Sequence, residues 1–461
     1  MTDDEVAFLG SVEQARMIRA KEISPVELVT LYLERCDRLN PRLHAYLTLA
    51  ADYALREADR ATRGLGEPDL PPFHGVPISI KDLADTAGIR TTHGTASHRD
   101  HVPTVDDPVV AKLKRAGFII LGKSNTPEYG VGSTDPIGYD TCRNPWDLTR
   151  TVGGSSGGAA AAAAAGLCAV SHGGDGGGSI RIPAAYCGVV GVKPSRGRIS
   201  NSPNIPSLLA TAGPISRTVA DAAGFLDAVS GYGTGDPWWL DRPARPFLEE
   251  AATEPGRLRI AVSTDCPEAP PFRGNADAIT ATSKVLLDLG HEVEEVTVPW
   301  PGADTDRAFF VSYGGKLAAS QDEMPRRELL DPIIQHMLDI VVGLTAEEYV
   351  RAENHLRLVS RQVVAFFSDY DVLLCPSVAV PPLPIERLRD EQVDAEASLL
   401  VTSTFNITGQ PAFSLPMHWH DDGMPVGVQI VGRPADEATL FRLAAQLENA
   451  KPWAARRPPC E

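Results

Sequence analysis

Cysteine is scarce in this sequence and follows no spacing typical of a metal site or a disulfide framework. The chain of 461 residues contains seven cysteines, an odd number, and no two of them form a Cys-x-x-Cys pair. Scattered cysteines of this kind indicate reduced thiols in a cytosol, and they argue against a fold held together by disulfides or a cysteine-ligated zinc ion.

Basic residues are fewer than acidic residues in this sequence. The chain has 43 lysines and arginines against 60 aspartates and glutamates, which gives a formal net charge of −17. This charge is repelled by phosphate backbones and anionic lipid surfaces, so nucleic acid and membranes are disfavoured as main partners. We therefore expect a small or neutral substrate.

Long hydrophobic runs are absent as well. The longest apolar stretch, residues 159–170, is alanine-rich and too short to cross a bilayer. The first ten residues, MTDDEVAFLG, contain neither a basic segment nor an apolar one, so we expect no secretory signal. These absences predict a cytoplasmic protein.

Short apolar runs do alternate with amphipathic segments from about residue 72 onward. VPISI (76–80) and FIILG (118–122) are typical of buried strands, whereas residues 106–117 have helical spacing. This alternation predicts an α/β fold with a substantial sheet.

Strand-like composition returns near the end of the chain, in PVGVQIVGR (425–433). We therefore expect the C-terminal part to complete the sheet begun near residue 76, and residues 1–461 to form one domain. The expected parts are a helical N-terminal region (1–71), a catalytic core (72–232), a connector with a helical excursion (233–370), and a C-terminal part that completes the sheet (371–461).

Two adjacent serines, Ser155 and Ser156, lie in the glycine frame of GGSSGGAAAAAAAG (153–166). The pattern Gly-x-Ser-x-Gly fits both, and in α/β-hydrolases it marks a nucleophile between a buried strand and a helix. The alanine run fits the helix, but the preceding NPWDLTRTV is too polar for the strand. The late histidine that such a triad needs could come only from the polar segment MHWHDDG. The α/β-hydrolase interpretation is therefore disfavoured.

A second glycine cluster, GGDGGGSIRIPA (173–184), places three glycines directly before Ser179. Unhindered backbone N–H groups beside a hydroxyl are the parts of an oxyanion hole. A tight turn that closes onto a strand explains the cluster equally well. A phosphate-binding loop does not, because no Gly-x-x-x-x-Gly-Lys-Ser/Thr pattern is present.

Lys81 directly follows the apolar run VPISI (76–80). If this lysine is buried, desolvation lowers its pKa and lets the neutral amine act as a base. The alternative, and the commoner case for lysines in general, is a strand-end lysine whose charge lies in water.

Taken in chain order, the apolar run followed by Lys81 and the two glycine clusters resemble the motifs of the amidase signature family of serine hydrolases. The likeness spans roughly residues 20–450 and includes HGVPISIKD (74–82), LGKSNTPEYG (121–130) and GPISRTVAD (213–221). It implies a central mixed β-sheet covered by helices on both faces. It also implies an amidase, a hydrolase of carbon–nitrogen bonds other than peptide bonds, with no cofactor and no metal.

The resemblance further implies a Ser-cisSer-Lys catalytic unit. Ser179 is the nucleophile, Ser155 the bridging serine and Lys81 the base, with a cis peptide bond at Gly154–Ser155. The proton of Ser179 passes through Ser155 to neutral Lys81 during attack on a carbonyl carbon, and water then hydrolyses the acyl-enzyme. The backbone donors assigned to the oxyanion are Gly176, Gly177, Gly178 and Ser179.

Three neighbouring residues have supporting roles in this interpretation. Ser156 either steadies the relay through a hydrogen bond or is purely structural. Asp175 and Arg181 flank the nucleophile, and we expect them to form a buried ion pair, because unpaired burial would be costly. The alternative is that Arg181 binds a substrate carboxylate.

Gly176 departs from many members of the family, which carry threonine or serine there, and His172 lies upstream of it. This variation resembles the branch that includes 6-aminohexanoate cyclic dimer hydrolase and urethane-cleaving amidases. Glycine would widen the space beside the nucleophile, whereas His172 is alternatively a satisfied core histidine. The residues expected near the substrate pocket are Tyr129, Ile205, Phe309 and Tyr313.

The leading hypothesis is a stand-alone amidohydrolase for small, largely neutral amides, with esters and carbamates as alternative substrates. A homodimer is one assembly that such an enzyme could form. The amidase subunit of a glutamine-dependent tRNA amidotransferase is the second hypothesis, although the acidic charge argues against an RNA-associated complex. A non-catalytic binding protein is the third, and the presence of all three catalytic positions argues against it.

Overall fold

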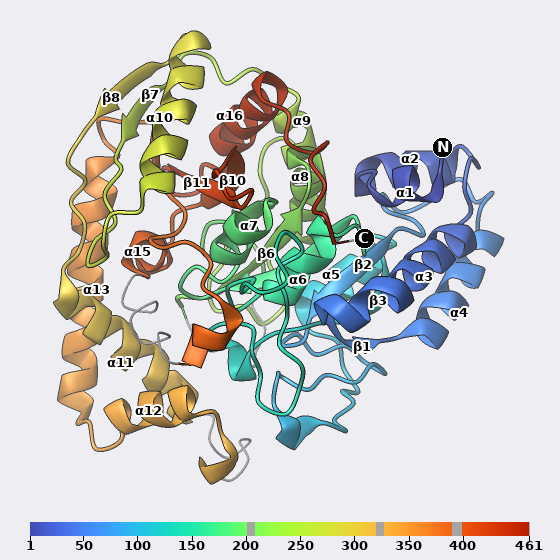
Figure 1. The fold of residues 1–461 in the computed structure, drawn as a ribbon, viewed down its shortest axis with the longest axis horizontal. Helices are drawn as coiled ribbons and strands as arrows, with labels where there is room; N and C mark the ends of the chain where they lie inside the picture. The colour runs from blue at the N-terminus through green and yellow to red at the C-terminus, as the bar shows by residue number, and fades with distance from the viewer. Residues whose placement is uncertain (201–207, 320–326, 390–398, 461) are drawn as a thin grey trace.

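The computed structural model describes residues 1–200, 208–319, 327–389 and 399–460 (Figure 1). Its strands are β1 (Tyr46–Leu49), β2 (Pro77–Lys81), β3 (Ile119–Ser124), β4 (Val170–Asp175), β5 (Val190–Lys193), β6 (Thr211–Ser216), β7 (Arg259–Val262), β8 (Glu292–Glu295), β9 (Val372–Pro376), β10 (Ala412–Trp419) and β11 (Pro425–Gly432). They form one 11-stranded sheet in the order β1-β3-β2-β4-β6-β5-β10-β11-β9-β7-β8.

This sheet is mixed. β2 runs parallel to β3 and β4, and β7 runs parallel to β8 and β9. The strands between these two groups pair antiparallel, and β10 joins β5 on one side to β11 on the other. The mixed sheet confirms the predicted fold class. That the chain forms one domain stays a prediction, which the shared sheet supports.

Helices surround the sheet. They are α1 (Asp3–Ala7), α2 (Ser11–Arg19), α3 (Pro25–Leu43), α4 (Ala51–Arg63), α5 (Pro108–Arg115), α6 (Gly157–Ala164), α7 (Arg181–Cys187), α8 (Val219–Val229), α9 (Phe247–Ala251), α10 (Arg273–Asp288), α11 (Ala303–Ala319), α12 (Pro332–Val341), α13 (Ala346–Phe366), α15 (Leu400–Thr408) and α16 (Glu437–Ala450). Figure 1 shows α11, α12 and α13 grouped at one end of the molecule, away from α1 to α4. None of the described helices is long and apolar enough to cross a membrane.

The two faces of the sheet are covered by different helices, as adjacent residues of β4 show. Neighbouring side chains of a strand point to opposite faces. A Cβ on Gly173 would lie 3.0 Å from Ile180 and 3.2 Å from the Ser156 hydroxyl, on the side of α6 and α7. The ring of His172, by contrast, stacks against Phe225 of α8. Helices thus cover both faces, as predicted.

The alanine run forms α6, and all eight residues of this helix are buried. It packs directly on the sheet: a Cβ on Gly158 would lie 2.3 Å from the backbone nitrogen of Asn125, which follows β3. Small side chains permit this close approach, as the sequence indicates. The approach holds Ser155 and Ser156, just before α6, beside the ends of β2 and β4.

Candidate active site

Lys81 is the last residue of β2 and its side chain is buried. Its Nζ donates to Ser155 Oγ at 2.6 Å and lies 3.4 Å from the carbonyl oxygen of Gly174. Burial lowers the pKa of Lys81 from 10.5 to about 7, although the Asp175 carboxylate opposes the shift. A large share of Lys81 is therefore neutral near pH 7 and can accept a proton.

Ser155 follows a cis peptide bond, Gly154–Ser155, as the resemblance implies. Glycine is required at position 154, because a Cβ there would lie 1.9 Å from the carbonyl oxygen of Gly132. Within the described residues, no hydrogen bond joins the hydroxyls of Ser155 and Ser179. The structure thus brings Lys81 and Ser155 together but leaves the second step of the predicted relay unformed. Catalytic hydrogen bonds often tighten only when substrate binds.

Ser156 connects the three segments of the site. Its hydroxyl donates to the carbonyl oxygen of Gly174 at 3.0 Å and accepts from the Gly174 N–H at 3.1 Å. Its backbone N–H donates to the carbonyl oxygen of Ser179, also at 3.0 Å. These bonds fasten the start of α6 to β4 and to the loop that carries Ser179.

The loop from Gly176 to Ser179 connects β4 to α7 and differs in one detail from the expected oxyanion hole. The N–H of Gly178 donates to the Asp175 carboxylate at 2.8 Å, so it faces away from a substrate. Among the described residues, no acceptor faces the N–H groups of Gly176, Gly177 and Ser179. These three groups, and not Gly178, are the candidates for oxyanion donors.

Asp175 and Arg181 form the expected buried ion pair. Arg181 donates from Nε and Nη2 to the two carboxylate oxygens of Asp175, at 2.9 and 2.8 Å. Its remaining N–H groups donate to Thr402, Asn406 and Gln429. Burial alone would raise the pKa of Asp175, but the Arg181 guanidinium holds it well below its ordinary value. Arg181 is therefore saturated by protein groups and does not face a substrate carboxylate.

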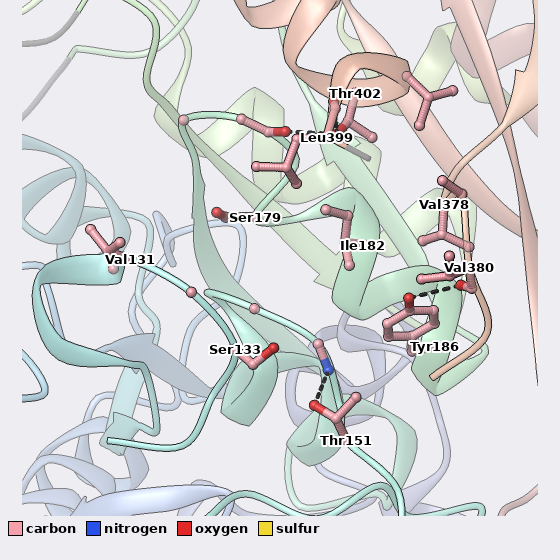
Figure 2. A pocket seen from close by; sticks show the side chains of 18 of the residues that line it. Val131, Ser133, Thr151, Ser179, Ile182, Tyr186, Val378, Val380, Leu399 and Thr402 are labelled. Atoms are coloured by element: carbon pink, nitrogen blue, oxygen red, sulfur yellow. Dashed lines mark hydrogen bonds between the residues drawn. The ribbon is translucent and has the colours of Figure 1, made fainter. Parts of the chain in front are cut away.

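A pocket with a cavity volume of about 130 Å³ opens beside Ser179. In Figure 2, Ser179 lies among the lining side chains, with Val131 to its left, Ser133 below it, and Ile182 and Tyr186 to its right. None of the described side chains that line the pocket carries a charge. The space therefore favours a neutral group.

The residues predicted near the substrate pocket do not all line it. Phe309 and Tyr313 of α11 line the pocket, with their rings stacked 6.1 Å apart. Tyr129 does not line it, although the next residue, Gly130, does. Tyr129 has a positive φ of 49°, and its ring lies against His98. Ile205 lies outside the described residues.

Several lining residues escaped the sequence analysis. Thr402 of α15 donates from its hydroxyl to the carbonyl oxygen of Gly177 at 2.7 Å. Tyr186 donates to the carbonyl oxygen of Val380 at 2.9 Å, and both line the pocket. The segment FNITGQPAFSLP (405–416), a further part of the chain that resembles the amidase signature family, begins three residues after Thr402. It indicates the neighbourhood, but no spacing identifies Thr402 itself.

His172 lies on the face of the sheet opposite to Ser156. It is buried beside Phe225, and neither ring nitrogen has a hydrogen-bond partner among the described residues. Burial lowers its pKa to about 3, and the Lys123 and Lys81 ammonium groups act in the same direction. His172 is therefore a neutral core residue, but not a satisfied one, and it is not part of the pocket wall.

Comparison with known proteins agrees with this geometry. A sequence model of the family described as Amidase matches residues 27–441. The 6-aminohexanoate-cyclic-dimer hydrolase of Paenarthrobacter ureafaciens is 35% identical, over 96% of this chain and 95% of the relative. An acylamidase of Rhodococcus erythropolis is 34% identical, over 99% and 98%. A glutamyl-tRNA(Gln) amidotransferase chain of Syntrophobacter fumaroxidans is also 34% identical, over 95% and 96%.

A solved structure of 6-aminohexanoate cyclic dimer hydrolase complexed with substrate superposes with a TM-score of 0.91 at 32% identity. The match covers 98% of this chain and 99% of that one. The chain therefore belongs to the amidase family, the amidase signature enzymes, and it is a hydrolase of carbon–nitrogen bonds.

Proposed function

We propose that this enzyme hydrolyses small, largely neutral amides through an acyl-enzyme on Ser179. One observation carries the proposal: Nζ of the buried Lys81 lies 2.6 Å from Ser155 Oγ, and Gly154, the residue before Ser155, lines the same uncharged pocket as Ser179. A neutral base, a bridging hydroxyl and a nucleophile beside unbonded N–H groups are the parts that acyl transfer requires.

The reaction begins with proton transfer. Neutral Lys81 accepts the hydroxyl proton of Ser155, which takes the proton of Ser179 as Ser179 Oγ bonds to the amide carbon. Negative charge then develops on the substrate oxygen, where the N–H groups of Gly176, Gly177 and Ser179 can donate to it. These donors belong to the backbone, so a side-chain change at any of the three leaves the N–H in place.

Collapse of the tetrahedral intermediate breaks the carbon–nitrogen bond. The leaving amine takes the proton held by Lys81, returned through Ser155, and the acyl group stays on Ser179. Water then enters, loses a proton to the same relay and attacks the ester carbon. Carboxylate is released with the hydroxyl of Ser179 restored, so each cycle consumes one water and leaves the enzyme unchanged.

The pocket supports the neutral substrate class. Phe309, Tyr313 and Ile182 offer apolar surface to the acyl or amine portion, and the described lining provides no ionic partner. Free glutamine carries both an ammonium and a carboxylate group, and burying either without an ion partner is unfavourable. This argues against the glutamine-dependent amidotransferase function. Esters and carbamates present the same carbonyl to Ser179 and remain candidate substrates.

A substrate panel tests the proposal. The purified chain is assayed against p-nitroanilides, aliphatic amides, esters and carbamates, and ammonia release from glutamine is measured in parallel. We expect hydrolysis of uncharged amides and no release of ammonia from glutamine. Glutamine hydrolysis that exceeds hydrolysis of every neutral amide would support the amidotransferase function instead.

A further inference from the structure

A second cluster of reactive side chains lies outside the pocket, on the segment that follows β2. Asp85, His93 and His101 each offer one ligand atom, and these atoms all lie within 4.8 Å of one another. We propose that this cluster binds a zinc ion. The proposal goes beyond the amidase activity and does not depend on the proposed substrate.

The distances suit a small metal ion. Asp85 Oδ1 and His93 Nε2 are 3.3 Å apart, close enough to form an ion pair when His93 is protonated. Two ligands bound tetrahedrally to zinc at about 2.0–2.1 Å lie roughly 3.4 Å apart. Asp85 and His93 thus already have the spacing of zinc ligands, and the ligand atom of His101 lies within 4.8 Å of both.

The donor set favours zinc over magnesium and calcium. Two imidazoles and one carboxylate are ligands that zinc takes in proteins, whereas magnesium and calcium prefer sets made of oxygen. The ring of His98 lies 5.5 Å from that of His93 and 5.8 Å from that of His101. The His98 ring thus lies beside the cluster, and a water molecule can complete four-coordination around zinc.

The backbone holds the ligands in place. The N–H of Thr91 donates to the carbonyl oxygen of His101 at 3.0 Å, so the segment 91–101 closes into a loop. The His93 N–H donates to the carbonyl oxygen of Asp82, also at 3.0 Å, and fixes the loop to the end of β2. Because the loop is closed and fixed, binding zinc orders few additional groups, which favours affinity.

The site is open to metal entry. The side chains of His93 and Asp85 are 16% and 20% exposed, and His101 is exposed. The loop also touches the rim of the pocket, because the N–H of Tyr129 donates to the carbonyl oxygen of His93 at 2.9 Å. Gly130, the next residue, lines the pocket. Zinc at this site would therefore stabilise one wall of the pocket from behind.

Isothermal titration with zinc chloride tests the proposal on tag-free protein that has been treated with EDTA and desalted. We expect one zinc per chain. His93→Asn, which keeps a residue that tolerates the positive φ of 53°, and His101→Gln should each weaken zinc binding by at least about 10-fold. His336→Gln, an exposed histidine on α12, is the matched control and should bind as the unchanged protein does.

Thermal unfolding gives a second readout. Zinc should raise the Tm of the unchanged protein and of Ser179→Ala, but not that of His101→Gln, because only a folded site binds the ion. His101 is exposed, so its replacement should fold even if His93→Asn does not. The proposal is wrong if the unchanged protein binds no zinc, if both cluster variants bind it equally well, or if magnesium binds as tightly as zinc.

Discussion

Lys81 and Ser155 are 74 residues apart in the sequence, yet 2.6 Å separates the amine nitrogen of one from the hydroxyl oxygen of the other. The end of β2 provides the lysine, and the segment before α6 provides the serine. The contact is buried, so the loss of water that lowers the pKa of Lys81 also strengthens its hydrogen bond to the serine.

The activity should depend on pH through Lys81. Only the neutral amine accepts a proton, so kcat/KM for a neutral amide should rise with pH and pass an inflection near pH 7, where about half of Lys81 is deprotonated. Lys81→Ala should lower kcat/KM by roughly 10²–10⁴-fold and remove that inflection. Steady-state kinetics across the neutral range measures both effects.

The exposed Lys284→Ala of α10 is the control, and its pH profile should match that of the unchanged enzyme. A Lys81→Ala variant that kept both its activity and the inflection would assign the pH dependence to another group.

Breaking the ion pair behind the nucleophile should destabilise the fold. Arg181→Met leaves the Asp175 carboxylate buried without its guanidinium, and such a loss typically costs about 3–5 kcal/mol of unfolding free energy. Urea denaturation at neutral pH measures this. Because the pKa of Asp175 is lowered in the folded state, the stabilisation is present above its ordinary pKa and is lost only as the pH falls below that value.

The exposed pair Arg351 and Glu347 on α13 serves as the comparison, with side chains 74% and 71% exposed. Arg351→Ala should change the unfolding free energy by less than about 1 kcal/mol. Equal effects of the two arginine substitutions would show that the buried pair is not a main support of the loop.

Gly176 should control the size of the accepted substrate. A Cβ at this position would lie 3.2 Å from the Tyr313 ring, so Gly176→Ser narrows the pocket against α11. We expect kcat/KM for a bulky anilide to fall by roughly 5–150-fold, the range that corresponds to overpacking of about 1–3 kcal/mol. Hydrolysis of acetamide should change much less, because the small acyl group does not reach the ring.

Competition between the anilide and acetamide in one reaction gives the ratio of their kcat/KM values directly. Adding Tyr313→Ala to Gly176→Ser should restore kcat/KM for the bulky anilide, because the second substitution removes the opposing ring. If both substrates decline together, position 176 acts on the geometry of the nucleophile rather than on pocket size.

The sequence predicted the parts of the site that local residue type determines. Glycine at 154 and alanines in α6 indicate close approach, and the apolar run before Lys81 indicates a strand end. The resemblance then joined Lys81, Ser155 and Ser179 into one unit. The relay roles of these residues remain proposals, since the structure shows the contact of Lys81 with Ser155 and not that of Ser155 with Ser179.

What the sequence missed depends on how distant segments meet. Gly178 was predicted as an oxyanion donor, but the loop folds back so that Asp175 accepts its N–H. Tyr129 was predicted in the pocket, but it does not line it, and its ring lies against His98. Thr402 was not predicted, because it reaches Gly177 across 225 residues. Periodicity and motif spacing are local signals and carry no such information.

The central claim is an acyl-enzyme on Ser179, and mass spectrometry of the quenched reaction tests it most directly. The enzyme is mixed with p-nitrophenyl butyrate, quenched in acid during the burst, digested and mapped. The account predicts one butyryl group, located on Ser179 itself by fragmentation of the peptide, and none after Ser179→Ala. A butyryl group on Ser155 or Ser156, or undiminished turnover by Ser179→Ala, would contradict it.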